Sequence, residues 1–236
     1  MIVKLFAFDF DKTITVCDTV LPISRYLCNS LNQKYKFKII QFYFVLFRFH
    51  LISGKSFKEK IISTLLFGKG QDRIENIITR FYTNYYSILF NHEIAELIRS
   101  EKEKGNKVII ITSNLDLFVD PIKNILHIDD VFATNVEVSE NIIGNKIKGE
   151  NCTGKFKAEI LLRYRSTNNF EKMIAYGDSF GDFAMLSKAN EGFIAEYIFK
   201  NIIEKLQYKL KNLNGSIPLN CNIVFKNFSE KNHAEG

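Results

Sequence analysis

Four aspartates at two places in the chain are spaced for metal or phosphate chemistry. Asp9 and Asp11 come directly after the apolar run of residues 2–8, and Asp178 and Asp182 lie in the segment GDSFGD. Carboxylates are seldom buried without partners, and a group of them at one place is repulsive unless a cation lies between them. Hard oxygen ligands without histidine or cysteine favour magnesium over zinc. The pattern therefore points to a magnesium site that handles phosphate.

The segments around these aspartates indicate how a fold could bring them together. Residues 2–8 are almost continuously apolar, as in a strand covered on both faces of a parallel sheet. Two further apolar segments, 108–112 and 172–176, are also predicted strands that end in polar residues. All three polar clusters should meet at one edge, because ligands of such sheets bind at the carboxyl ends of the strands. The cluster after the second strand consists of Thr112, Ser113 and Asn114.

The hydrophobic pattern changes twice along the chain. Residues 18 to about 104 show helical periodicity, broken at 53–56 and 68–72, which indicates an all-helical insert after the first strand. From Lys107 onward strands alternate with helices, so we predict an α/β fold with a doubly wound, Rossmann-like parallel sheet. The further elements expected here are a helix at 115–126, a strand at 131–134, a hairpin at 135–149 turning near Glu140 and Asn141, a helix at 156–166, a helix after Gly181, a strand at 192–195 and a long helix from about Phe199.

Composition and charge limit the classes of partner. The 236 residues carry a formal charge of +6, but the lysines are scattered among acidic residues, which does not favour nucleic acid and is compatible with a small anionic substrate. The four cysteines form no CxxC pair and no signal peptide precedes the first strand, so we expect a reduced, cytoplasmic protein. The most apolar stretch, 37–52, is shorter than the roughly 20 residues of a membrane span. We interpret it as a helix packed within the insert rather than as a membrane-surface helix. The pattern indicates no oligomeric state.

The motifs, in their order, resemble those of the haloacid dehalogenase superfamily of phosphotransferases. They are DFDKT at 9–13, TSN at 112–114, a lysine downstream and GDSFGD at 177–182, and the resemblance extends from Phe6 to about Ala189. The helical insert and the run from Ala133 to Leu161 are similar to the phosphoserine-phosphatase-like branch, subclass IB. This resemblance implies a catalytic core of residues 1–16 and 91–236 and a helical cap of residues 17–90 over the site.

The resemblance also implies roles for the first two motifs. Asp9 would be the nucleophile, since its carboxylate is ionised at neutral pH and requires no activating base. Asp11 would protonate the leaving oxygen and then deprotonate water, and the two carboxylates share a face only if the strand persists past Asp9. Thr112, with Ser113 and Asn114, would bind a phosphoryl oxygen at the start of a helix, although Ser113 or Asn114 could be an ordinary helix cap.

The last two motifs would neutralise charge and hold the metal. Lys157 would offset charge on the phosphoryl group and on the nucleophile, and Lys155 is the alternative for this position. Asp182 would act through water or by orienting Lys157. The expected Mg²⁺ ligands are the carboxylates of Asp9 and Asp178 and the backbone carbonyl of Asp11.

These roles imply a magnesium-dependent phosphatase that hydrolyses a phosphomonoester through an aspartyl-phosphate. Asp18 matches the amine-reading glutamate of phosphoserine-specific members but is one methylene shorter, which leaves the substrate open. An aromatic-rich stretch of the cap is either buried or the mouth for a lipid phosphate of the phosphatidylglycerophosphate type, and transfer to an acceptor other than water would use the same motifs. A non-catalytic phosphate-binding protein should lack Asp9, Asp11 or Asp178, and all three are present. The aromatic residues are Phe42, Tyr43, Phe44, Phe47 and Phe49.

Overall fold

A six-stranded sheet forms the centre of the computed structural model, which describes residues 3–198, 202–218 and 222–228. Its order is β3-β2-β1-β6-β7-β8, and every neighbouring pair is parallel except β7 and β8. The doubly wound α/β fold predicted from the alternation of strands and helices is therefore confirmed. The strands are β1 (Leu5–Phe8), β2 (Lys107–Leu115), β3 (Asp130–Thr134), β6 (Met173–Gly177), β7 (Glu191–Ile198) and β8 (Asn222–Asn227).

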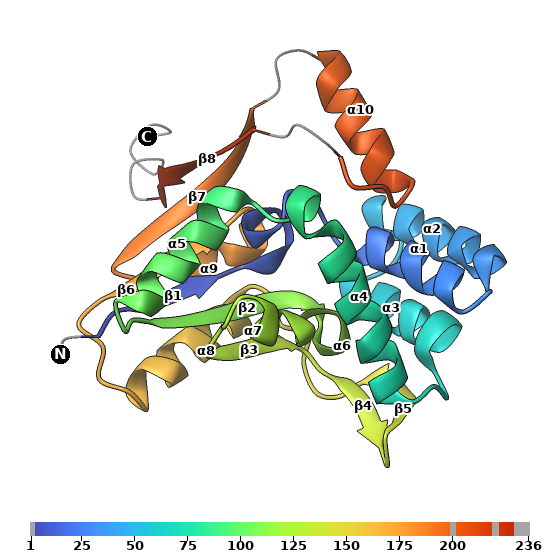
Figure 1. The fold of residues 1–236 in the computed structure, drawn as a ribbon, viewed down its shortest axis with the longest axis horizontal. Coiled ribbons are helices and arrows are strands. Elements are labelled where there is room, and N and C mark those ends of the chain that lie inside the picture. The colour runs from blue at the N-terminus through green and yellow to red at the C-terminus, as the bar shows by residue number, and fades with distance from the viewer. Residues whose placement is uncertain (1–2, 199–201, 219–221, 229–236) are drawn as a thin grey trace.

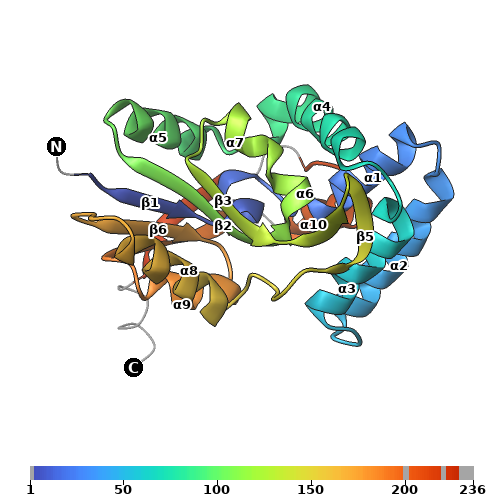
Figure 2. The same ribbon diagram turned by 90° about the horizontal axis from the view of Figure 1, so that it is seen from below.

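Helices cover both faces of this sheet. Figure 2 shows α5 and α7 on one face and α8 and α9 on the other, with the sheet edge-on between them. All four residues of β1 are buried, as expected for a central strand covered on both sides. The helices are α1 (Val20–Ser30), α2 (Lys34–Arg48), α3 (Gly54–Ile61), α4 (Gln71–Leu89), α5 (His92–Glu103), α6 (Asp116–Val119), α7 (Pro121–Ile125), α8 (Lys155–Ser166), α9 (Phe183–Leu186) and α10 (Ile202–Leu213), with single turns η2 (Ile62–Leu66) and η3 (Phe180–Asp182).

The helical insert leaves and rejoins the sheet region at one place. Thr15 and Phe90 form an isolated β-bridge. Next to it, the Val16 amide donates to the Leu89 carbonyl at 2.8 Å. Helices α1 to α4 lie between these crossing points and gather at one end of the molecule (Figure 2). We retain the division into a core of 1–16 and 91–236 and a cap of 17–90 as a proposal.

A β-hairpin from the second half of the chain contacts this insert. It consists of β4 (Val136–Ser139) and β5 (Ile142–Ile147). The Ile143 amide donates to the Lys69 carbonyl, and the Gly68 amide donates to the Ile143 carbonyl, both at 2.9 Å. The loop after η2 thereby satisfies backbone groups that an isolated hairpin would leave unpaired at its edge. The expected hairpin is present, and it packs against the helices that precede it by some 70 residues in the chain.

Two expected helices differ from those observed. The helix predicted at 115–126 is two short helices, α6 and α7, because Pro121 has no backbone N–H to donate. The helix predicted after Gly181 is limited to η3 and α9. The final helix is present as α10, and its predicted start at Phe199 lies outside the described residues. Strand β8, which was not predicted from the sequence, returns to pair antiparallel with β7.

The C-terminal part of the chain runs from the sheet to the helical insert and back. Figure 1 shows α10 reaching toward α1 and α2 before the chain returns as β8. The Tyr208 hydroxyl donates to the Val16 carbonyl at 3.1 Å, at the point where the chain enters the insert. Arg25 of α1 donates to the carbonyl of Asn214 at 3.0 Å. This segment therefore connects the sheet, the crossing point and the insert.

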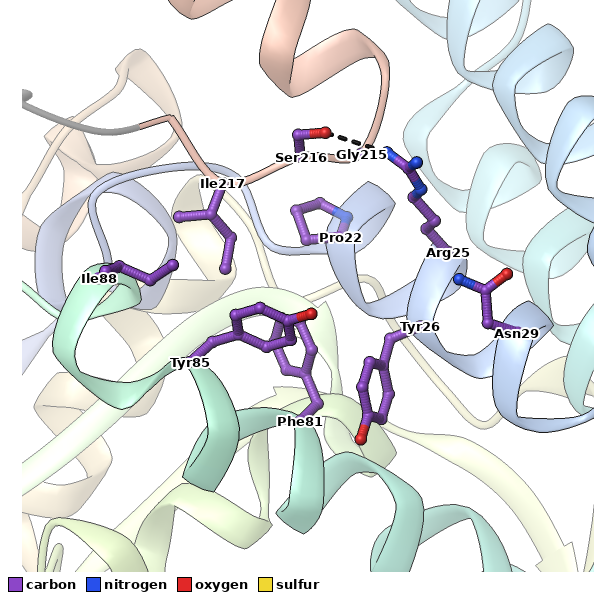
Figure 3. Close-up of a pocket in the computed structure, with 10 residues that line it drawn as sticks. All are labelled: Pro22, Arg25, Tyr26, Asn29, Phe81, Tyr85, Ile88, Gly215, Ser216 and Ile217. Carbon is purple, nitrogen blue, oxygen red and sulfur yellow. Dashed lines mark hydrogen bonds between the residues drawn. The ribbon is translucent and has the colours of Figure 1, made fainter.

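A cavity of about 370 Å³ lies where this segment meets the insert (Figure 3). Tyr26, Phe81 and Tyr85 from α1 and α4 form its apolar wall. At its rim, Arg25 donates to the Ser216 hydroxyl at 3.0 Å. The residues that line this cavity include neither Lys157 nor any aspartate of the sequence motifs, so it is separate from the predicted site.

The aromatic-rich stretch forms α2 and the turn after it. Phe44 and Phe47 are half-buried and pack against Phe57 of α3, with ring centroids 5.7 and 5.3 Å away. Phe57 itself is only 4% exposed, whereas Phe42 on the same helix as Phe44 is 58% exposed. These contacts favour the buried alternative for Phe44 and Phe47. Among the described residues, no helix combines the length and the apolar character needed to cross a bilayer.

We predict that Phe57→Ala lowers the free energy of unfolding by about 3–5 kcal/mol, because it empties the space between α2 and α3. Phe42→Ala is the matched control on the exposed side and should change it by less than about 0.5 kcal/mol. Urea denaturation followed by circular dichroism measures both. Equal losses in the two variants would contradict the packing of α2 described above.

Candidate active site

Asp9 stands at the carboxyl end of the central strand. Its amide donates to the Tyr176 carbonyl at 2.8 Å, which continues the pairing of β1 with β6 by one residue. Its backbone is extended and the residue is 5% exposed. Phe8 lies opposite Tyr176 of β6, which ends one residue later, and opposite Ile110 of β2, which continues to Leu115. The sheet therefore places this carboxylate at the edge where parallel strands bind ligands.

Lys157 pairs with two of the motif aspartates. Its ammonium group lies 2.5 Å from Asp9 Oδ1 and 2.6 Å from Asp182 Oδ1, and the residue is 2% exposed. Burial alone would lower the pKa of this amine, but the two carboxylates outweigh burial and raise the pKa of Lys157 above its usual value. Lys157 is therefore a buried cation. Lys155, the alternative from the sequence, lies exposed at the start of α8.

The GDSFGD segment folds around the Asp182 carboxylate. Asp182 Oδ2 accepts hydrogen bonds from the amide of Asp178 at 3.2 Å and from the amide and hydroxyl of Ser179 at 3.0 and 2.8 Å. With Lys157 on its other oxygen, Asp182 has four donors. A Cβ atom at Gly177 would lie 2.5 Å from the Cβ of Asp182, so only glycine fits where the strand passes this side chain.

Three carboxylates in this region could hold a cation. Asp9, Asp178 and Asp182 can each offer one oxygen, and these oxygens lie within 4.8 Å of one another. Burial raises the pKa of Asp9 well above its usual range. Lys157 opposes this rise, whereas the nearby carboxylates of Asp182 and Asp178 add to it. Burial also raises the pKa of Asp178 to about 6, although Lys12 at 3.6 Å opposes this. A hard divalent cation would relieve this repulsion, so the donor set fits Mg²⁺.

Asp11 is oriented by residues from two directions. Its Oδ1 accepts from the amide and the hydroxyl of Thr19, both at 2.7 Å, and its Oδ2 accepts from the Asn114 amide group at 2.9 Å. Burial and then the negative charge of Asp18 raise the pKa of Asp11 to about 7. The strand ends at Phe8 and a turn follows, with φ of +60° at Lys12. The strand therefore does not extend past Asp9, and the turn rather than the alternation of side chains along a strand positions Asp11.

The TSN segment has different local contacts from those expected. Strand β2 continues through Leu115, so Thr112, Ser113 and Asn114 lie in the strand and not at the start of a helix. Thr112 Oγ1 accepts from the Asn114 amide at 3.2 Å. The Asn114 side chain donates to Asp11 and, at 3.0 Å, to Thr19. The prediction that this segment lies at the start of a helix is therefore wrong. Asn114 instead orients Asp11 through its side chain. The register of β2 against β3 shifts across this segment, between Ile111, which lies opposite Phe132, and Leu115, which lies opposite Thr134.

Asp18 lies close to this group without joining the Lys157 network. Its Oδ1 accepts from the Val20 amide at 3.0 Å, near the start of α1. It is half-buried, and its charge is felt by Asp11, as the raised pKa of Asp11 shows. The structure therefore places Asp18 at the border between the insert and the aspartate cluster.

Lys58 is a site-proximal residue that the sequence analysis missed. It lies on α3, is 8% exposed, and donates to the Ser113 carbonyl and to side-chain oxygens of Thr134 and Asn151. Burial lowers the pKa of Lys58 to about 8. The signal that could have identified it is helical spacing, since Phe57 and Ile61 place position 58 near the buried face of α3. Lys58 ties the insert to the ends of β2 and β3.

Comparison with known proteins agrees with this geometry. Residues 6–187 match the family model of haloacid dehalogenase-like hydrolases. The chain belongs to this family. The hydrolase is 30% identical to Protein CicA of Caulobacter vibrioides over 191 residues, which are 79% of this chain and 83% of CicA. It is 27% identical to the phosphoserine phosphatase of Methanocaldococcus jannaschii, over 79% of this chain and 82% of that one.

A solved structure of a substrate-bound phosphoserine phosphatase has the same fold as this hydrolase. The TM-score is 0.58 at 22% sequence identity, with 80% of this chain and 84% of that chain covered. The resemblance to the phosphoserine-phosphatase-like branch, which the motifs and the insert indicated, is confirmed.

We predict that Gly177→Ala destabilises this hydrolase by about 1–3 kcal/mol, because the new methyl group would displace the Asp182 side chain. Gly54→Ala is the matched control, since its Cβ would meet its nearest neighbour at an ordinary 3.5 Å. Thermal unfolding of the two variants makes the comparison. A Gly177→Ala protein as stable as the control would contradict the close approach of Gly177 and Asp182.

Proposed function

We propose that this protein is a Mg²⁺-dependent phosphatase that hydrolyses a phosphomonoester through a phosphorylated Asp9. The observation that carries the proposal is the position of Asp9. Its carboxylate lies at the carboxyl edge of the sheet, paired with a buried lysine and within reach of two further carboxylates. Family membership supports a hydrolase with this class of chemistry.

The metal would be held by oxygen ligands around Asp9. The carboxylates of Asp9 and Asp178 and the backbone carbonyl of Asp11 are the ligands we propose. Asp182 already accepts from four donors, so its proposed role is to orient Lys157. When bound, Mg²⁺ would offset the negative charge of the carboxylates and of the phosphoryl oxygens.

In the first step, Asp9 attacks the phosphorus in line with the leaving oxygen. A bond forms between a carboxylate oxygen and phosphorus while the ester P–O bond breaks, and Asp11 donates its proton to the leaving alcohol. A pKa of Asp11 of about 7 suits this role, because an appreciable fraction is protonated at neutral pH. Lys157 balances the negative charge on Asp9 and on the phosphoryl oxygens.

In the second step, Asp11 acts as the base. It takes a proton from a water molecule, the water oxygen attacks phosphorus, and the bond to Asp9 breaks to release phosphate and restore both aspartates. Thr19 and Asn114 hold the Asp11 carboxylate in one orientation through both steps. Thr112 and Ser113 are proposed to contact the phosphoryl group at the end of β2.

The substrate class we propose is a small phosphomonoester with a positive group near Asp18. The curated relative from Methanocaldococcus jannaschii is named a phosphoserine phosphatase, which makes phosphoserine the first ester to test. Lys58 does not offer a free ammonium group to a substrate, because three oxygens already accept from it. Phosphate release from a panel of soluble and lipid phosphomonoesters identifies the substrate.

We predict that Asp9→Asn lowers turnover by a factor on the order of 10⁴ or more, because an amide cannot act as the nucleophile. The exposed Glu159 on α8 provides the control, Glu159→Gln, which makes the same chemical change and should keep wild-type turnover. Circular dichroism establishes that both variants are folded. Turnover by Asp9→Asn close to that of the control would exclude the covalent mechanism.

We also predict that phosphate release requires Mg²⁺. A chelator should abolish it and added Mg²⁺ should restore it, because the acidic cluster is repulsive without a cation. Asp178→Asn should raise the Mg²⁺ concentration for half-maximal activity tenfold or more, whereas Glu159→Gln should leave it unchanged. Full activity in excess chelator would rule out the metal role.

A further inference from the structure

Helix α2 has apolar residues on two opposite sides. One side packs inside the insert, where Phe37 and Ile40 are buried. The other side carries an apolar row spaced by four and three residues, which places its members on one face of the helix. We call this row the outer stripe: it consists of Tyr35, Ile39, Phe42 and Leu46 of the helix and Phe49, the residue directly after it.

The outer stripe is largely exposed. The exposed fraction is 68% for Tyr35, 40% for Ile39, 58% for Phe42 and 73% for Phe49. Leu51 continues it beyond the helix at 70% exposed. A helix at the surface of a globular protein normally turns a polar face outward, and large aromatic side chains in one exposed row mark an interaction surface. Figure 2 shows α2 at the end of the molecule farthest from the N-terminus.

Most lysines of the chain are scattered among acidic residues, but the segment around this helix is an exception. Residues 19–58 contain no aspartate or glutamate, and they hold seven lysines and arginines. Because the formal charge of the whole chain is +6, this segment accounts for its positive excess. Lys34 and Lys38 lie along one flank of the outer stripe, and with Arg25 and Gln41 they line a cavity of about 470 Å³.

We propose that the outer stripe docks on an anionic membrane surface. Its aromatic side chains would enter the boundary between headgroups and acyl chains, and Lys34, Lys38 and the cavity beside them would receive acidic headgroups. α2 has 15 residues and would lie in the plane of the surface rather than cross it. This docking does not depend on the reaction proposed above.

Charge complementarity selects this occupant over the others. A second copy of the chain would bring the same positive segment to the interface, and like charges would oppose the contact. A nucleic acid would pair with the lysines but offers no partner for a row of Tyr, Ile, Phe and Leu side chains. An anionic bilayer provides both negative charge and an apolar layer beneath it. From the sequence we interpreted this stretch as a helix packed within the insert rather than as a membrane-surface helix. The exposure of the outer stripe now favours the membrane-surface alternative for that side of α2.

The test is flotation of the purified full chain with vesicles of phosphatidylcholine alone and of phosphatidylcholine mixed with phosphatidylglycerol. The wild type should float with the mixed vesicles, only weakly with the neutral ones, and less as salt is added. Phe42→Gln combined with Phe49→Gln should weaken binding tenfold or more, since each removes an inserted aromatic side chain. The control, Leu162→Gln with Leu210→Gln, changes exposed leucines on α8 and α10 and should bind like the wild type.

A second pair of variants examines the charge. Lys34→Gln with Lys38→Gln should weaken binding about tenfold and reduce its salt dependence, whereas Lys188→Gln with Lys205→Gln, two exposed lysines elsewhere, should do neither. Turnover of a soluble ester should be unchanged in all four double variants and verifies that they are folded.

Three flotation results would overturn the proposal. They are flotation with neither vesicle, equal flotation with both, and equal losses in the stripe variant and its leucine control. A dimer in analytical ultracentrifugation that the Phe42 and Phe49 changes abolish would assign the stripe to a second copy of the chain instead.

Discussion

The ion pair of Lys157 with Asp9 and Asp182 is the interaction on which the rest of the site depends. A buried ammonium group is stable as a cation only when carboxylates compensate for its lost hydration. Here they come from positions 148 and 25 residues away in the chain. The pair can form only if β1, the start of α8 and the loop after β6 reach one edge of the sheet. The order of the central strands, with β1 between β2 and β6, meets this condition.

The two aspartates of the first motif have different environments although they are two residues apart. Asp9 has a lysine and other carboxylates as neighbours, whereas Asp11 accepts from Thr19 and Asn114. Thr19 lies where the chain enters the helical insert, and Asn114 lies at the end of β2. The hydrogen bonds that orient Asp11 therefore also join the insert to the sheet, and Lys58 joins the same two parts on the other side of β2. Movement of the insert would alter the orientation of Asp11.

The insert combines a tight interior with an incompletely covered exterior. Phe47 of α2 stacks on Phe57 of α3 inside it, while other aromatic residues of α2 remain in contact with solvent. Exposed aromatic side chains cost solubility and favour association, so their persistence in one row beside positive charge has to be explained by something outside the fold. The proposed interaction surface provides that explanation. Aromatic residues on one side of α2 pack inside the insert, and those on the opposite side would contact the membrane.

The central parallel strands, the helical insert and the motif aspartates could be predicted from the amino-acid sequence. Hydrophobic periodicity is a local property, so it predicted β1, β2, β6 and the change from helices to alternating elements. The motif aspartates followed from residue type and position, whereas the lysine near position 157 was implied by the resemblance to the family. The folded chain distinguishes Lys157 from Lys155 as the residue near Asp9. It also gives Asn114 its contact with Asp11 and brings Lys58 to the end of β2. It alone paired β8 with β7, placed the hairpin against the insert and left the outer stripe exposed. Each of these depends on contacts between residues far apart in the chain, or on what covers a helix face, and periodicity along a single segment carries no information about either.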